Sequence, residues 1–168
     1  MTDWAARFVV IGLTAWAALQ TPAAHAGVHV DYSGAASPGT IVVQTSARTV
    51  LLVVGSGKAI QYTAGVGQTG KQWFGTTRVV DKQIRPAWAP PRDMLGNRPD
   101  RVIPGNSPRN PLGAAALVLA DHQLAIHGTN NPSSIGNLVS WGCVRLQNEE
   151  IMDLYNRVRV GTPVIFAR

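Results

Sequence analysis

The residues best suited to covalent chemistry are Cys143, the only cysteine in the 168-residue chain, and His127, which precedes it by sixteen positions. A thiol becomes a nucleophile when a nearby base or a positive environment raises its thiolate fraction. The residues between the two are rich in Gly, Asn, Ser and Pro, which form turns, so we expect this loop to bring His127 and Cys143 together. The pair predicts acyl transfer through a cysteine nucleophile. By composition alone, the alternative is a buried free cysteine that packs as a small hydrophobe.

Gly142 directly precedes the cysteine and has no side chain to cover the backbone. Attack of a thiolate on a carbonyl creates an oxyanion, which backbone N–H groups stabilise when they point at it. We therefore expect the N–H groups of Gly142 and Cys143 to form an oxyanion hole.

The chain around these residues is predicted to be mostly β, because β-branched runs dominate it. Strands are expected at residues 40–45, 49–54, 59–64 and 76–80, with a turn at 55–58 and a closing strand at 162–166. A hairpin of residues 115–119 and 123–126, turning at Asp121 and His122, is expected to carry His127 at the end of its second strand.

One amphipathic helix is expected after the cysteine. Asn148 is a good N-cap residue, and Glu149 and Glu150 then lie at the positive end of the helix dipole. The apolar residues that share one face are Ile151, Leu154, Tyr155 and Val158. Gly161 is expected to end the helix.

Residues 81–113 hold seven of the eleven prolines together with several arginines. Proline fixes φ and removes a backbone donor, which excludes a central strand or a helix interior. We expect a long Pro- and Arg-rich surface loop, and loops of this length in compact domains are often lids or binding loops. Trp88 and Met94 are its expected packing anchors, and a disordered insertion is the alternative.

Residues 1–26 have the pattern of a secretory signal peptide. Arg7 precedes an apolar run, and small residues stand at the two positions that signal peptidase recognises. The apolar run of about 12 residues is shorter than the roughly 20 of a membrane-spanning helix. We expect cleavage before Gly27, a flexible mature N-terminus over residues 27–39, a catalytic domain over residues 40–168, and no transmembrane segment in the mature chain.

The net charge is +6, and loss of residues 1–26 leaves it unchanged because Asp3 and Arg7 leave together. Twelve of the fifteen basic residues are arginines, but they are scattered and form no basic helix or aromatic-interleaved motif, which argues against nucleic acid as a partner. A cationic exported protein suits the anionic polymers of a periplasm or cell envelope. The remaining histidines are scattered and form no zinc-site pattern with one cysteine, so no metal or other cofactor is expected.

Several stretches of the chain follow one another in a specific order. They are Ile126–Asn130, Ser133–Gly136, Ser140–Leu146, Asn148–Glu150, Asp153–Tyr155 and Val160–Val164. This order, with His-Gly-Thr ahead of Gly-Cys-Val-Arg, resembles the catalytic core of the L,D-transpeptidase family, also called the YkuD domain. The resemblance covers roughly residues 40–167 and weighs strongly against a merely structural Cys143.

The resemblance implies a mostly β sandwich of the L,D-transpeptidase type with its site at one end of a sheet. It implies that Cys143 attacks the carbonyl that joins diaminopimelate to D-Ala in a peptidoglycan tetrapeptide stem, expels D-Ala and forms a thioester. An amine of a second stem, or of an envelope protein, would resolve the thioester. Two other hypotheses remain open: an L,D-carboxypeptidase that uses water as acceptor, and a peptidoglycan-binding module without turnover.

The resemblance also assigns roles to single residues. It makes His127 the base and the backbone carbonyl of Gly128 the group that orients it. The candidate substrate-binding residues are Arg145, Ser140, Trp141 and Asn130. The guanidinium of Arg145 suits a stem-peptide carboxylate, and a structural ion pair with an acidic residue of the following helix is the alternative. Relatives usually have His where this chain has Trp141.

Overall fold

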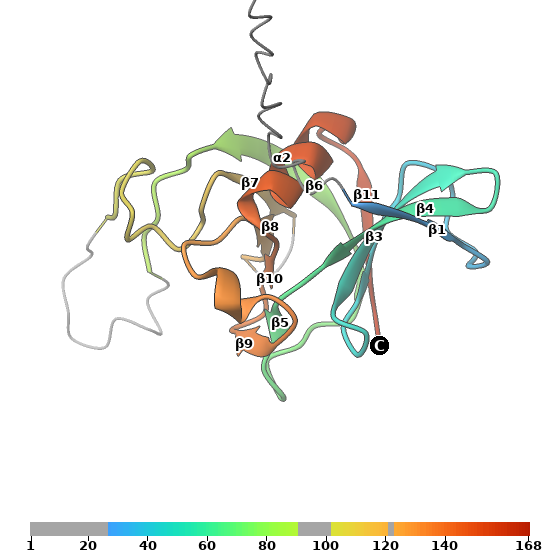
Figure 1. Cartoon of the computed structure of the whole chain (residues 1–168), viewed down its shortest axis with the longest axis horizontal. Coiled ribbons are helices and arrows are strands. Elements are labelled where there is room, and N and C mark those ends of the chain that lie inside the picture. The colour runs from blue at the N-terminus through green and yellow to red at the C-terminus, as the bar shows by residue number, and fades with distance from the viewer. Residues whose placement is uncertain (1–26, 91–101, 121–122) are drawn as a thin grey trace, which may run out of the picture.

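The computed structural model describes residues 27–90, 102–120 and 123–168, and they form a mostly β fold with one α-helix (Figure 1). The strands are β1 (Val28–Asp31), β2 (Ile41–Gln44), β3 (Thr49–Gly55), β4 (Lys58–Thr63), β5 (Val66–Gly67), β6 (Gly75–Ile84), β7 (Ala115–Leu119), β8 (Ala125–His127), β9 (Leu138–Ser140), β10 (Val144–Arg145) and β11 (Pro163–Ala167). The helices are the 3-10 turn η1 (Pro132–Ser134) and α2 (Asn148–Arg157). The predicted fold class is confirmed.

The strands of the main sheet run in the order β1-β4-β3-β2-β11-β6-β7-β8-β10, and β5 pairs separately with β9. The long strand β6 joins the two halves of the main sheet. Its first residues pair with β11, its last residues pair with β7, and the register shifts between Val79 and Asp81. Such an irregularity bends a strand and increases its twist. The sheet therefore divides into a β1–β4 half and a β7–β8–β10 half, which lie on opposite sides in Figure 1.

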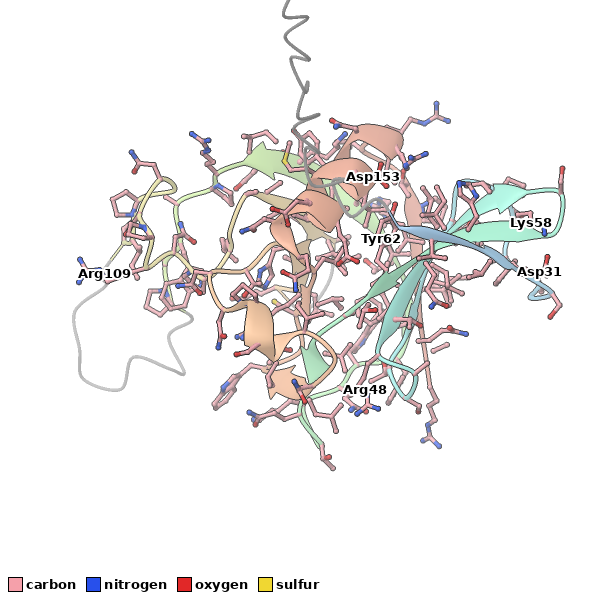
Figure 2. The ribbon with its side chains drawn as sticks, viewed as in Figure 1. Asp31, Arg48, Lys58, Tyr62, Arg109 and Asp153 are labelled. Carbon is pink, nitrogen blue, oxygen red and sulfur yellow. The ribbon has the colours of Figure 1, made fainter. Side chains whose placement is uncertain are left out.

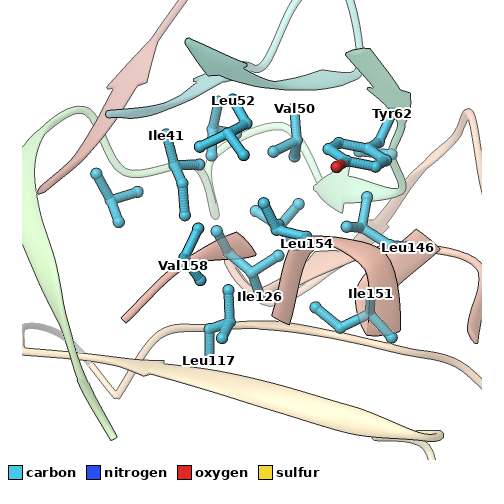
Figure 3. Packing of buried hydrophobic residues seen from close by; sticks show 14 of the residues in the cluster. Ile41, Val50, Leu52, Tyr62, Leu117, Ile126, Leu146, Ile151, Leu154 and Val158 are labelled. Atoms are coloured by element: carbon cyan, nitrogen blue, oxygen red, sulfur yellow. The ribbon is translucent and has the colours of Figure 1, made fainter. Parts of the chain in front are cut away.

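The apolar faces of the two halves and of α2 share one core (Figure 3). Ile41, Leu52 and Tyr62 come from the first half, Leu117 and Ile126 from the second, and all five are almost completely buried. Helix α2 packs on β7 and β8 and adds its predicted apolar face to this core. Burial of this face, more than helix propensity, stabilises a helix of only ten residues.

The boundaries of α2 differ from the prediction. Gln147, not Asn148, is the N-cap, and the carboxylate of Glu150 accepts the backbone N–H of Gln147 at 3.2 Å. The helix ends at Arg157, four residues before Gly161, which instead adopts a positive φ of 93° in the turn before β11. Asn148 is not the cap because its side chain binds another segment of the chain.

Two further predictions are wrong at their boundaries. Residues 27–39 were expected to be flexible, but β1 pairs antiparallel with β4 over four residues, and Lys58 forms an ion pair with Asp31 at its end. The Pro- and Arg-rich loop was expected to begin at residue 81, but β6 continues to Ile84 because its N–H and C=O groups pair with β7. The first proline of residues 81–113 is Pro86, which lies beyond the end of this strand.

The described part of the Pro- and Arg-rich loop is ordered by polar contacts. Trp88 and Ile103 exchange two backbone hydrogen bonds. The buried amide of Asn110 donates to the carbonyls of Pro86 and Pro104, and its oxygen accepts the N–H of Leu112. Asn110 thereby holds both ends of this loop together.

Some expectations concern residues outside the described ranges. These are the signal peptide over residues 1–26, the anchoring role of Met94, and the hairpin turn at Asp121 and His122. In the ranges that are described, no helix is long and apolar enough to cross a membrane.

A buried polar group ties α2 to the first half of the sheet. The Tyr62 hydroxyl, which has no exposed surface, donates to the Asp153 carboxylate at 2.7 Å, and Arg157 donates to the same carboxylate from one turn further along α2 (Figure 2). Burial alone raises the pKa of Asp153, but hydrogen bonds from Arg157 and Tyr62 outweigh it and hold this pKa below its ordinary value. The ionised carboxylate is therefore the form that the fold stabilises.

We expect Tyr62→Phe to lower the free energy of unfolding at pH 7 by about 1–3 kcal/mol, because the hydrogen bond from a buried hydroxyl to a charged, partly exposed carboxylate is lost. The depressed pKa of Asp153 makes this contribution present above the unfolded-state value of about 3.9 and lost as the pH falls through the lower folded value. Urea unfolding of both proteins between pH 3 and pH 7 measures the difference. Tyr32→Phe is the control, and an equal cost of Tyr62→Phe at pH 3 and pH 7 contradicts the role of the charge.

Candidate active site

Parallel pairing of β8 with β10 places the sequence-predicted residues next to one another. Val144 lies opposite Ile126, and Arg145 lies opposite His127. Val144 and Ile126 point into the core. Because alternate residues of a strand point to opposite faces, Arg145, His127 and Cys143 project from the other face. The structure thus brings a thiol, an imidazole and a guanidinium to one patch at the end of the sheet.

His127 is held as a neutral base. Its side chain is 4% exposed, and the Nδ1 atom lies 2.6 Å from the carbonyl oxygen of Gly128. A carbonyl only accepts, so Nδ1 carries the proton and Nε2 keeps its lone pair. Burial lowers the pKa of His127 to about 4, the hydrogen bond to Gly128 opposes this shift, and the charge of Arg145 adds to it. The imidazole is therefore neutral at pH 7 and able to accept a proton at Nε2.

The thiol of Cys143 faces the start of β8, with Sγ 4.0 Å from the carbonyl oxygen of Gln123. Burial raises the pKa of Cys143, while a backbone hydrogen bond from Ala125 and the charge of Arg145 act in the opposite direction. With a raised thiol pKa and a lowered imidazole pKa, both side chains are neutral at rest near pH 7. Proton transfer then has to accompany attack on a substrate.

Ser140 braces the loop that carries the cysteine. Its hydroxyl donates to the Cys143 carbonyl and accepts the N–H of Gly142 at 3.1 Å, and its side chain is 2% exposed. This corrects two expectations, because Ser140 is buried beneath the loop instead of facing a substrate, and the Gly142 N–H is already bonded. The N–H of Cys143 has no hydrogen-bond partner within the described ranges and so could donate to a bound group.

The backbone conformation at position 142 requires glycine. Its φ is 128°, a conformation that L side chains rarely adopt, and a Cβ there would lie 2.9 Å from the Leu124 side chain. The expectation of a bare backbone before the cysteine holds for this steric reason.

Asn148 holds the segment after His127. Its Oδ1 accepts the N–H groups of Ala114 and Thr129 at 3.0 and 3.1 Å, and its Nδ2 donates to the Thr129 carbonyl at 2.9 Å. A Cβ on Gly128 would lie 2.4 Å from this Oδ1, so only glycine fits there. Sequence reasoning missed this role, because a residue at a helix start is first interpreted as a cap.

Asn130 extends from the same segment toward the Pro- and Arg-rich loop. Its Nδ2 donates to the Pro108 carbonyl at 3.3 Å. Together with Arg85, Thr129 and Asn148 it lines a polar cavity of about 470 Å³ between the two loops. Asn130 is therefore exposed to a hollow beside the site, where a substrate could be contacted.

Arg145 lies at the centre of the patch. Its backbone exchanges two hydrogen bonds with Gly65, and its Nε is buried with no hydrogen-bond partner within the described residues. The ion pairs seen in the same ranges, Lys58–Asp31 and Arg157–Asp153, do not include it. A buried guanidinium nitrogen of this kind is suited to an anionic group of a ligand.

Trp141 is 54% exposed beside the cysteine loop, and the Lys71 ammonium lies 4.3 Å from its ring centre. Trp73 instead packs edge-on against Phe166 at 5.3 Å. Of these two tryptophans, Trp141 is the one whose side chain is largely exposed close to Cys143 in the sequence. Its indole has an N–H donor and no basic nitrogen, so it cannot take a proton from the thiol.

The chain is similar to known L,D-transpeptidases in sequence. The sequence model of the YkuD family, the L,D-transpeptidase catalytic domain, matches residues 38–166 of this chain. The probable L,D-transpeptidase YbiS of Escherichia coli K12 is 38% identical over 138 residues, which cover 76% of this chain and 44% of YbiS. The probable L,D-transpeptidase ErfK/SrfK of Salmonella typhimurium is 37% identical over 110 residues, covering 60% and 34% of the two chains. The chain thus spans less than half the length of these relatives.

The fold is also found in solved structures. L,D-transpeptidase 3 of Mycobacterium tuberculosis, with a faropenem-derived adduct, has a TM-score of 0.60 at 20% identity, covering 77% of this chain and 60% of that one. A cysteine-to-serine variant of the Enterococcus faecium L,D-transpeptidase has a TM-score of 0.61 at 15% identity, covering 77% and 50%. The match to the family domain spans most of the described residues, including His127 and Cys143. The chain therefore belongs to the YkuD family of L,D-transpeptidase catalytic domains.

Proposed function

We propose that the chain is an exported cysteine acyl-transferase that cross-links peptidoglycan in the periplasm or cell envelope. The single observation that carries the proposal is the β8–β10 register, which puts Cys143, His127 and Arg145 on one face. The acyl donor is a tetrapeptide stem that ends in diaminopimelate and D-Ala. The acceptor is an amine of a second stem, or of an envelope protein.

In the first half-reaction the Cys143 thiol gives its proton to Nε2 of His127 as Sγ attacks the carbonyl carbon of diaminopimelate. The resulting oxyanion receives the N–H of Cys143. As the tetrahedral intermediate collapses, the C–N bond to D-Ala breaks, and His127 returns the proton to the departing amine. The product is a thioester on Cys143 and free D-Ala.

In the second half-reaction the acceptor amine attacks the thioester carbonyl, and His127 takes a proton from the attacking nitrogen. The C–S bond then breaks, and the thiolate recovers that proton. The neutral resting state of His127 supports both steps, because an imidazole with a pKa of about 4 is free to accept a proton throughout the neutral range. No step requires a metal or an organic cofactor.

Substrate binding is assigned to three residues around the nucleophile. Arg145 pairs with a carboxylate of the stem, since its guanidinium lies in the site with a buried, unpartnered Nε. Trp141 forms an apolar wall beside Cys143, because its exposed indole directly precedes the Gly142–Cys143 pair. Asn130 contacts the stem from the polar cavity beside the site.

The central experiment incubates the processed protein with a disaccharide tetrapeptide and identifies the products by mass. We expect a dimer that lacks one D-Ala, and we expect Cys143→Ala and His127→Ala to lower its rate by at least about 10² to 10⁴. His29→Ala, at an exposed position of β1, is the control. A tripeptide alone would assign the hydrolase instead, and unchanged turnover in Cys143→Ala would refute the mechanism.

The pH dependence of acylation tests the base. Because burial lowers the pKa of His127 to about 4, the rate of β-lactam acylation of Cys143 should stay level across the neutral range and fall as the pH drops through about 4. In His127→Ala the reaction should instead follow the thiol, whose pKa is raised, and become fast only at alkaline pH. Mass spectrometry of the adduct over time measures both profiles. Superimposable profiles would show that His127 is not the base.

The carboxylate partner of Arg145 is tested with two tetrapeptides, one with a free terminal carboxylate and one amidated. We expect Arg145→Gln to raise KM about tenfold for the ligand whose carboxylate it binds, equivalent to roughly 1.4 kcal/mol. Arg145→Lys keeps the positive charge but loses the planar guanidinium. It should therefore keep the pH profile of Cys143 acylation and lose part of the preference for one tetrapeptide over the other. Arg48→Gln, on an exposed turn, is the control. Equal loss for both tetrapeptides would place the carboxylate elsewhere.

A further inference from the structure

Gly27 occupies a position where only glycine fits. It lies directly before β1, which pairs with β4 from Val28 opposite Gln61. A Cβ on Gly27 would lie 2.5 Å from the Ile60 side chain and 2.6 Å from the ring of Tyr62. The backbone of residue 27 is therefore packed against β4.

Gly27 lies against the ring of Tyr62, whose hydroxyl donates to the Asp153 carboxylate on α2, and a backbone hydrogen bond from Gly27 is among the causes that lower the pKa of Asp153. This carboxylate also receives the Tyr62 hydroxyl at 2.7 Å and the Nε of Arg157 at 2.9 Å. Three donors from β4, α2 and the start of β1 thus converge on one carboxylate, which Figure 2 shows beside Tyr62.

Gly27 is also the residue that follows the signal-peptide pattern Ala24-His25-Ala26. Two independent features therefore coincide at the backbone nitrogen of Gly27. The sequence pattern predicts cleavage of the peptide bond before Gly27, and the fold places Gly27 close to the Asp153 carboxylate. A hydrogen bond from an amide would serve a chain in which this bond stays intact. A carboxylate forms a stronger hydrogen bond with a charged donor, such as an ammonium group, than with a neutral amide N–H.

We propose that Gly27 becomes the N-terminal residue and that Asp153, with Tyr62, is a binding site for its α-ammonium group. Cleavage thereby converts an amide hydrogen bond into an ion pair that fastens β1 to α2. The ligand class is a primary ammonium, supplied by the chain itself.

The covalent step is hydrolysis of the peptide bond between Ala26 and Gly27 by a signal peptidase. Water adds across the bond, leaving a carboxylate on Ala26 and an amine on Gly27. The amine takes up a proton from solvent at neutral pH, because an α-amino group has a pKa of about 7.7–8.0.

The charged and titratable groups around this nitrogen are the Asp153 carboxylate, Arg157 and Glu150 from α2, and Tyr62 from β4. The carboxylate in contact with the ammonium favours its protonated form. A raised α-amine pKa makes the stabilisation fully present below the unfolded value of about 7.7–8.0 and lost as the pH rises through the folded value.

The test starts from the full chain expressed with export and isolated after processing, so that cells choose the N-terminus. Mass spectrometry is expected to find Gly27 as the first residue, and any other N-terminus overturns the proposal. The α-amine is then acetylated near pH 6.5, where it reacts ahead of the lysines as long as its pKa stays below their ordinary value of about 10.4. The acetyl group restores an uncharged amide at residue 27.

Thermal unfolding compares free and acetylated protein in the parent and in Asp153→Asn. Acetylation should lower the parent Tm by roughly 2–8 °C at pH 6.5 and by much less at pH 10. In Asp153→Asn the acetylation effect should disappear, because the charge partner is gone. An equal effect in both backgrounds, or an effect that does not depend on pH, overturns the proposal.

Arg157→Gln is the matched control, since it removes another partner of the same carboxylate and should leave the acetylation effect in place. Should Asp153→Asn fail to fold, the α-amine pKa of the processed parent decides the question by NMR of glycine-labelled protein. A value above 8.0 supports the ion pair, and a value at or below 7.7 rejects it. None of these measurements uses enzyme activity, so their failure is separable from failure of the proposed function.

Discussion

The parallel pairing of β8 with β10 is the contact on which the rest of the site depends. Both strands are short, and their register fixes Arg145 opposite His127 while Val144 and Ile126 point into the core. A slip of one residue would turn His127 and Arg145 inward and expose the apolar side chains. Burial of Val144 and Ile126 therefore selects the register, and the register in turn selects the chemistry. The hydrophobic core and the active site are two faces of the same ladder.

Backbone groups, held by buried polar side chains, complete this arrangement. Ser140 fixes the cysteine loop from one side, and Asn148 fixes the segment after His127 from the other. Both side chains form their hydrogen bonds with main-chain atoms. They thereby fix the backbone segments that carry the thiol and the imidazole. The glycines beside them, Gly128 and Gly142, are required by close approach and by a positive φ.

The electrostatics of the patch separate the resting state from the reactive one. Burial disfavours charge on both His127 and Cys143, so neither is ionised at pH 7 before a substrate arrives. The charge of Arg145 opposes an imidazolium and favours a thiolate, and a bound carboxylate would offset it.

The sequence by itself determined the fold class, most strand segments and the presence of a helix after the cysteine, and it singled out Cys143 and His127 as a candidate pair. These follow from local periodicity and from residue order, which a chain displays without folding. Only the tertiary structure decided what Asn148, Ser140 and the N–H of Gly142 do, because their partners lie on other segments and a short polar side chain is equally suited to a cap, a brace or a substrate contact. The ordering of Val28–Asp31 was likewise decided by a partner strand, β4, whose free N–H and C=O groups are a property of the assembled sheet.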